Sequence, residues 1–131
     1  MPVIPGENDC VLVALKKIGE VDRLVHAVMS DPTALARLAH VIDLAGCYPF
    51  FGLEFLLANL EFEEISVDAS TTVEEFAQNS GIYFLSCFVS DKQTEAETHA
   101  LALINGILHG VVVQGRKVHR AWKKRSQGET K

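Results

Sequence analysis

Apolar residues recur at helical spacing in the first third of the chain, and this pattern predicts a run of helices. Asn8 or Asp9 stands where a side chain caps a helix N-terminus, and Gly19 stands where a helix commonly ends. Residues 10–15 are apolar at every position, so we expect the first helix to be buried on all sides. The helices predicted from this spacing cover residues 10–18, 20–30 and 32–45.

The second half of the chain changes to the pattern of strands. Residues 81–89 are rich in aromatic and β-branched side chains, which favour sheets. Asn105-Gly106 separates two apolar runs and predicts a hairpin with a two-residue type I′ turn. The strands predicted from these signals cover residues 61–67, 81–89, 99–104, 107–113 and 117–122.

Two further helices are expected ahead of the strand at 81–89. Thr71 and Glu74 have the spacing of a capping box, in which each side chain accepts a hydrogen bond from the other's backbone N–H. This signal predicts a helix that ends near residue 80, and a shorter helix is expected over residues 53–60. Helices therefore come mainly first and antiparallel strands second, which is the order of an α+β domain with N-terminal helices packed on a C-terminal sheet.

Length and composition fit one folded domain. The 131 residues are 48% apolar and 22% charged, which excludes a disordered or collagen-like chain. No apolar run approaches the ~18 residues that span a bilayer, and the first residues lack the features of a signal peptide. We therefore expect a cytoplasmic protein without membrane contact, with one domain over 1–122 and a flexible basic tail over 123–131. Three cysteines without paired spacing predict reduced thiols.

Charge is divided unevenly along the chain. Residues 1–115 hold 5 basic and 16 acidic residues, whereas residues 116–131 hold 7 basic and 1 acidic residue, within a net charge of −5. A basic end on an acidic body is suited to bind an acidic partner or nucleic acid, and it serves equally as a solvated terminus. Both interpretations stay open at the level of sequence.

Cys10 and His99 are the pair of residues with catalytic chemistry. Cys10 stands at the start of a predicted helix, where the helix dipole lowers the pKa of a thiol. His99 stands at the start of a predicted strand, and a neighbouring imidazole forms a thiolate–imidazolium pair with such a thiol. The N–H groups of the first helical turn also suit an acyl oxyanion. The alternative interpretation is a buried, inert thiol and a strand-end histidine bonded to a backbone carbonyl.

Two segments resemble a known family. Asn8-Asp9-Cys10 with Ala14-Leu15 resembles the Asp-Cys-x-x-x-Ala-Leu opening of small papain-like cysteine peptidases, a group with bacteriocin-processing peptidases and phage and viral proteins. The segment 81–85, a loop, and then 99–106 (His-Ala-Leu-Ala-Leu-Ile-Asn-Gly) is similar to their C-terminal half. The first segment is also similar to the Cys helix of OTU-type deubiquitinases, without the Gly-Asn pair that precedes that cysteine.

The resemblance implies a papain-like fold and hydrolysis of peptide or isopeptide bonds through a thioester on Cys10, with His99 as general base and acid. A phage or viral relative would act in the host cytoplasm on a protein or peptide substrate. No cofactor is implied. The spacing of histidines and cysteines predicts no metal site.

The other members of such a site are less complete in this sequence. Asn105 lies about 20 Å along the strand from His99, so it belongs to the far turn. Hairpin register makes Gly110 and Gln114 the diagonal neighbours of His99. Similar phage proteins carry Asp near Gly110, which leaves Gln114 to orient the imidazole. Asn8 is the candidate oxyanion-hole residue and, alternatively, the helix cap.

The incomplete site keeps a second function open. A catalytically silent relative would use the same fold as a binding or assembly module of a phage or virus. The presence of both Cys10 and His99 favours the enzyme, and the glycine at position 110 favours the silent module.

Overall fold

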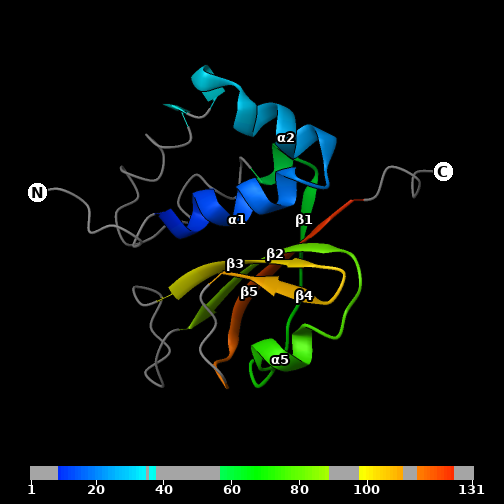
Figure 1. The fold of residues 1–131 in the computed structure, drawn as a ribbon. Coiled ribbons are helices and arrows are strands. Elements are labelled where there is room, and N and C mark those ends of the chain that lie inside the picture. Colours follow the sequence, from blue (N-terminus) through cyan, green and yellow to red (C-terminus); the bar gives the residue numbers. More distant parts are fainter. Residues whose placement is uncertain (1–8, 35, 38–56, 89–97, 111–114, 126–131) are drawn as a thin grey trace, which may run out of the picture.

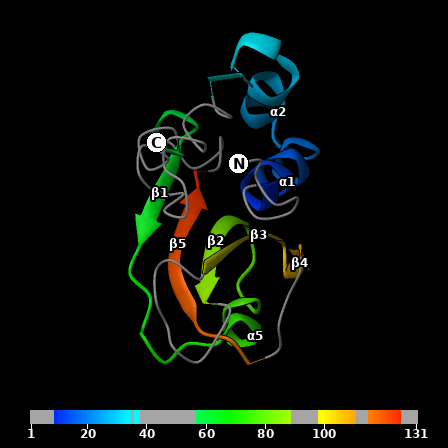
Figure 2. The ribbon, with the colours of Figure 1, turned by 90° about the vertical axis from the view of Figure 1, so that its left-hand side faces the viewer.

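The computed structural model describes residues 9–34, 36–37, 57–88, 98–110 and 115–125, without the side chains of Asp9, Cys10, Leu12 and Thr98. Helices α1 and α2 lie on one side of an antiparallel five-stranded sheet, and the short helix α5 lies on the other (Figures 1 and 2). The strand order is β1-β5-β2-β3-β4. The expected α+β architecture is confirmed. The elements are α1 (Asp9–Gly19), α2 (Arg23–Ser30), β1 (Phe62–Ile65), α5 (Val73–Phe76), β2 (Ile82–Phe88), β3 (Thr98–Ile104), β4 (Ile107–His109) and β5 (Val118–Lys124).

The sheet separates two apolar cores, because successive side chains of a strand point to opposite faces. On the face toward α1 and α2, small and aromatic strand residues pack against apolar helix residues. On the face toward α5, the strands contribute branched and aromatic side chains. The helix-face core includes Val11, Leu15, Ile18, Val25, Phe62, Phe84, Ala100, Ala102 and Trp122. The α5-face core includes Val73, Phe76, Tyr83, Leu85, Cys87, Leu101, Leu103, Val118 and Ala121.

Helix α1 is amphipathic rather than buried on all sides, which corrects the expectation from its apolar run. Val11 and Leu15 are buried against the sheet, whereas Val13 is 47% exposed and Lys16 is exposed. A helix that rests on one sheet face buries only one stripe of its surface. Apolar composition alone therefore overstated its burial.

Gly19 permits close helix packing, and its role differs from the expected left-handed C-terminal cap. It is the last residue of α1 and does not have a positive φ. A Cβ added there would lie 3.2 Å from the His26 Cα and 3.3 Å from the His26 backbone nitrogen. The absence of a side chain therefore lets the start of α2 approach the end of α1.

The β3–β4 hairpin has the predicted turn. Ile104 pairs with Ile107, and Asn105 and Gly106 have φ values of 50° and 89°. Positive φ at both central residues is the requirement of a type I′ turn. Strand β4 ends at His109, and the predicted continuation over 111–113 lies outside the described residues.

The capping box of α5 lies one residue later than predicted. The Thr72 Oγ1 accepts from the Glu75 N–H at 3.2 Å, and Glu75 Oε1 accepts from the Thr72 N–H at 3.0 Å. Thr71 instead joins the backbone of β5, since its carbonyl accepts from the Val118 N–H at 2.9 Å. The tertiary contact to β5 thus shifts the start of the helix.

Strand β5 continues past the predicted end of the domain at residue 122. Lys123 and Lys124 pair with β1, and the Arg125 N–H donates to the Glu61 carbonyl at 2.9 Å. The domain therefore extends through Arg125, and residues 126–131 lie outside the described residues. In the described ranges, no helix is long and apolar enough to cross a membrane.

Candidate functional site

Helix α1 runs in the same direction as β3, and this relationship places their first residues at one end of the sheet. The Oδ2 of Asp22, which follows α1, lies 3.2 Å from the Lys124 Nζ. Asp22 and Asn105, the residue after β3, line the same cavity. Helix α1 packs on β3 and spans about 15 Å. Its first turn therefore lies toward the beginning of β3, as Figure 1 shows. The backbone thus places the first turn of α1 and the beginning of β3 toward the same end of the sheet.

Cys10 occupies the first turn of α1, where the helix dipole stabilises a thiolate. The first turn also presents backbone N–H groups without helical partners. Asn8, the candidate oxyanion-hole residue, lies outside the described residues, as does the side chain of Cys10. The backbone alone therefore defines this half of the site.

His99 projects from the face of the sheet opposite α1. It alternates with Ala100 and Ala102, whose side chains belong to the helix-face core. It therefore shares its face with Leu101 and Leu103, which belong to the core under α5. His99 is the second residue of β3 and therefore lies close to the strand end toward which the first turn of α1 points.

Burial sets the charge state of His99. Its imidazole is half-buried, and desolvation lowers the pKa of His99 below the usual value of 6.5. Burial therefore favours the neutral ring, which is the form that accepts a proton as a general base. The same burial disfavours the protonated imidazolium form, which a thiolate–imidazolium pair requires.

Hairpin geometry limits the choice of a third catalytic residue. Gly110 has a φ of 125°, and a Cβ at this position would lie 2.7 Å from the Leu101 Cδ2. An acidic side chain at position 110 would therefore strain this backbone. Gln114 lies outside the described residues. Asn105 ties the far turn to the start of β2, because its Oδ1 accepts from the Gly81 N–H at 3.1 Å.

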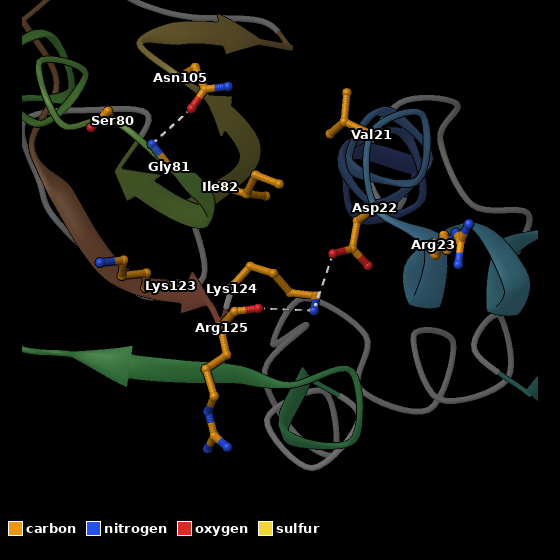
Figure 3. A pocket seen from close by; sticks show the side chains of 10 residues that line it. All are labelled: Val21, Asp22, Arg23, Ser80, Gly81, Ile82, Asn105, Lys123, Lys124 and Arg125. Atoms are coloured by element: carbon orange, nitrogen blue, oxygen red, sulfur yellow. Dashed lines mark hydrogen bonds and ion pairs between the residues drawn. The ribbon is translucent and has the colours of Figure 1, made fainter. Parts of the chain in front are cut away.

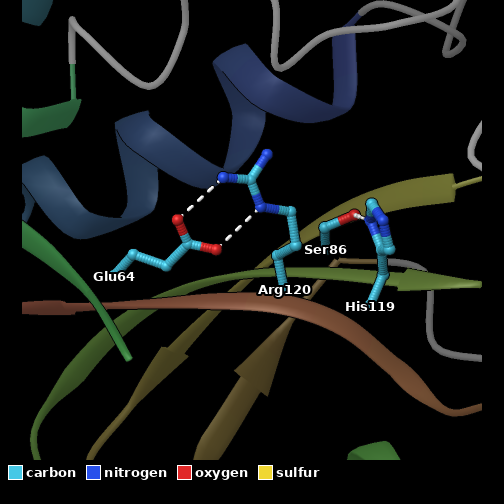
Figure 4. Close-up of polar contacts among 4 residues, drawn as sticks. All are labelled: Glu64, Ser86, His119 and Arg120. Carbon is cyan, nitrogen blue, oxygen red and sulfur yellow. Dashed lines mark hydrogen bonds and ion pairs between the residues drawn. The ribbon is translucent and has the colours of Figure 1, made fainter. Parts of the chain in front are cut away.

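A second polar cluster, which the sequence analysis did not identify, lies on the helix face (Figure 4). The register of β2 and β5 shifts after Ser86, which pairs with Arg120, whereas Cys87 pairs with Val118. The extra residue, His119, places its Nδ1 3.2 Å from the Ser86 Oγ. A β-bulge thus brings an imidazole to the face that α1 occupies. No pattern in the sequence predicts this bulge.

Ser86 is fully buried, which assigns it a structural role. A serine nucleophile must be reached by a carbonyl carbon, and a fully buried hydroxyl is inaccessible to one. The Ser86 hydroxyl instead orients the His119 ring, which also packs against Phe88 with ring centroids 4.9 Å apart.

Arg120 completes this second cluster. Its Nε and Nη2 donate to the two carboxylate oxygens of Glu64 at 2.8 and 2.7 Å, and its guanidinium lies 4.7 Å from the centre of the Trp122 ring. The hydrogen bonds from Arg120 lower the pKa of Glu64, a shift that partial burial opposes. Glu64 and His119 line a cavity of about 460 Å³.

The described side chains do not form a metal centre. Within the described ranges, no three His, Cys, Asp or Glu side chains come together at one point. Searches against protein-family models, curated proteins and solved structures find no match to this chain. The arrangement of its own residues is therefore the basis for the function proposed below.

Proposed function

We propose that this chain is a papain-like cysteine peptidase that cleaves peptide or isopeptide bonds, with Cys10 as nucleophile and His99 as general base and acid. One observation carries the proposal. Helix α1, which contains Cys10 in its first turn, packs along β3 in the same direction, so that its first turn lies toward the strand end that carries His99. The resemblance of the two sequence segments to that family supports the same pair.

The chemistry uses the groups at this end of the sheet. Neutral His99 takes the proton of the Cys10 thiol, and the sulfur attacks the substrate carbonyl carbon. The N–H groups of the first turn of α1 stabilise the negative oxygen that forms. The C–N bond then breaks, and the amine leaves with the proton from His99. Water hydrolyses the thioester, with His99 again accepting a proton, and Cys10 regains its thiol.

A second candidate is a catalytically silent module with the same fold. The observation that favours it is the position of His99 on the face opposite α1, together with the glycine at position 110, whose φ of 125° disfavours a side chain there. In such a module Cys10 would be an ordinary thiol, and the end of the sheet would bind a partner without covalent chemistry. The two candidates differ in the pKa of one thiol.

The pH dependence of alkylation distinguishes them. Iodoacetamide labelling rates at Cys10, measured by mass spectrometry, should give a thiol pKa clearly below the unperturbed ~8.5. Replacing His99 by Ala should raise this pKa, since a nearby imidazole no longer stabilises the thiolate. Cys87 serves as the internal control, because it is 3% exposed and should react only after unfolding.

His119→Ala is the matched control variant. It removes the other described imidazole near this part of the sheet, on the helix face rather than the α5 face. The proposal requires that His99→Ala shift the pKa of Cys10 and that His119→Ala leave it nearly unchanged. The reverse result would assign the imidazole role to His119, and a Cys10 pKa of ~8.5 or more in every variant would favour the silent module.

A further inference from the structure

A cavity of about 620 Å³ lies at the other end of α1 from Cys10 (Figure 3). The α1–α2 junction forms one wall, and the beginning of β2 and the end of β5 form the other. This cavity is at the opposite end of the α1–β3 pair from the site proposed above. A role for it therefore does not depend on the chemistry of Cys10.

The cavity concentrates positive charge in an acidic protein. Four of its lining residues are cations and one, Asp22, is an anion, whereas the whole chain carries a net charge of −5. The Lys124 side chain is 3% exposed, and its ammonium lies 3.2 Å from Asp22 and 3.7 Å from Glu61. These carboxylates neutralise the charge of Lys124 and hold its buried side chain in place beneath the cavity.

The other three cations remain available for a ligand. Arg23, Lys123 and Arg125 have no carboxylate within ion-pair distance in the part of the chain that the structure describes. In Figure 3 their side chains extend outward in different directions instead of meeting at one point. Cations spread around a rim suit several anionic groups along an extended ligand better than one small ion.

The apolar residues that line the cavity favour an acidic peptide over nucleic acid as its ligand. Val21, which is 57% exposed, stands on the helix side, and Ile82 stands on the sheet side. None of the described residues that line the cavity is aromatic. Sites for single-stranded nucleic acid typically stack bases on aromatic rings. An extended peptide can instead place an aliphatic side chain against Val21 and Ile82.

We propose that this cavity binds an acidic peptide segment of a partner protein, with carboxylates at Arg23, Lys123 and Arg125 and an apolar side chain against Val21 and Ile82. Asn105 and Ser80 on the sheet side offer polar groups to the peptide backbone. Lys123 and Arg125, which the sequence assigned to the basic tail, lie within the folded domain, so the proposed site uses no residue of 126–131.

The test is fluorescence anisotropy at low ionic strength, where ion pairs are least screened. The probe is a labelled peptide of about ten residues in which Glu alternates with Ala and Leu, and its control replaces every Glu by Gln. The full chain should bind the Glu peptide and not the Gln peptide. The triple variant Arg23→Gln, Lys123→Gln, Arg125→Gln should weaken binding by about tenfold or more.

A matched triple variant separates the cavity from overall charge. Lys16→Gln, Lys17→Gln, Arg37→Gln removes the same charge at residues that do not line the cavity, and it should change affinity by less than about threefold. Thermal melts of both variants confirm folding. Equal weakening by the two triples, or equal binding of the Gln peptide, would overturn the proposal.

Two other ligands are outcomes of the same experiment. Tighter binding of single-stranded DNA than of the Glu peptide, lost in the cavity triple, would assign the site to nucleic acid and overturn the peptide. Concentration-dependent dimerisation of the full chain, abolished only by the cavity triple, would make an acidic segment of a second copy the occupant and would overturn a separate partner protein.

Discussion

Cys87 on β2 stands directly opposite His99 on β3, on the sheet face that α5 covers. Residues paired in this way have Cβ atoms about 4.5–5.5 Å apart. The thiol is almost completely buried and the imidazole is half-buried. Burial disfavours the charged form of His99, so a neutral imidazole is favoured beside this thiol at the α5-face core. The half of β3 that carries the candidate catalytic histidine is therefore also part of a core.

The first prediction follows from the lowered pKa of His99. Because the folded pKa lies below the unfolded value of 6.5, the unfolded chain binds more protons as the pH falls. The free energy of unfolding is therefore highest above pH ~6.5 and decreases as the pH falls from there through the folded pKa. In His99→Gln this contribution should vanish, so its stability should fall less between pH ~6.5 and 5 than that of the wild type.

Urea unfolding at several pH values measures this difference. His26→Gln is the control, because it removes an exposed imidazole on α2. The His99 variant should have a shallower pH dependence than both the wild type and the His26 variant. Parallel curves for all three proteins would show that burial does not shift the titration of His99.

The second prediction tests the position of the α5 capping box. Thr72→Ala removes the side-chain acceptor for the Glu75 N–H and should reduce the free energy of unfolding by about 1 kcal/mol. Thr71→Ala leaves both capping bonds in place and should cost less than about 0.5 kcal/mol. Chemical denaturation of the two variants compares them. A larger loss in Thr71→Ala would place the cap where the sequence pattern alone suggested.

The third prediction concerns the β3–β4 turn. Gly106 has a φ of 89°, which a β-branched residue resists, so Gly106→Val should lower the free energy of unfolding by about 1–2 kcal/mol. Gly106→Asn should lower it less, since Asn tolerates left-handed backbone. Thermal melts of both variants test the order. Equal stability of the Val variant and the wild type would contradict the type I′ turn.

Much of the architecture could be predicted because local chemistry specifies it. Asn105-Gly106 forms the predicted turn, with positive φ at both residues. Asp22 accepts from the Val25 N–H at 3.0 Å and caps α2, a local contact that places the helix start at Arg23 rather than at the predicted residue 20. Such features depend on residues within one turn of each other. The capping box moved by one residue because Thr71 makes a long-range backbone bond, which local spacing does not reveal.

The same distinction between local and long-range contacts applies to the candidate site. The sequence by itself determined that a cysteine begins a helix and a histidine begins a strand, because helix and strand periodicity are local properties of the chain. Only the tertiary structure decided that His99 faces away from α1, because the face of a strand residue is set by which of its neighbours the helix covers. Ala100 and Ala102 have small side chains that let α1 pack close to the sheet. Because successive side chains of a strand point to opposite faces, His99 lies on the other face.

Two sites that the sequence did not predict also depend on the tertiary structure. The bulge at His119 exists because β2 and β5 pair out of step after Ser86, and the cationic cavity exists because the end of α1 meets the ends of β2 and β5. Both bring together residues that are distant in the sequence. Their proximity depends on packing between elements, which hydrophobic periodicity along one chain does not encode.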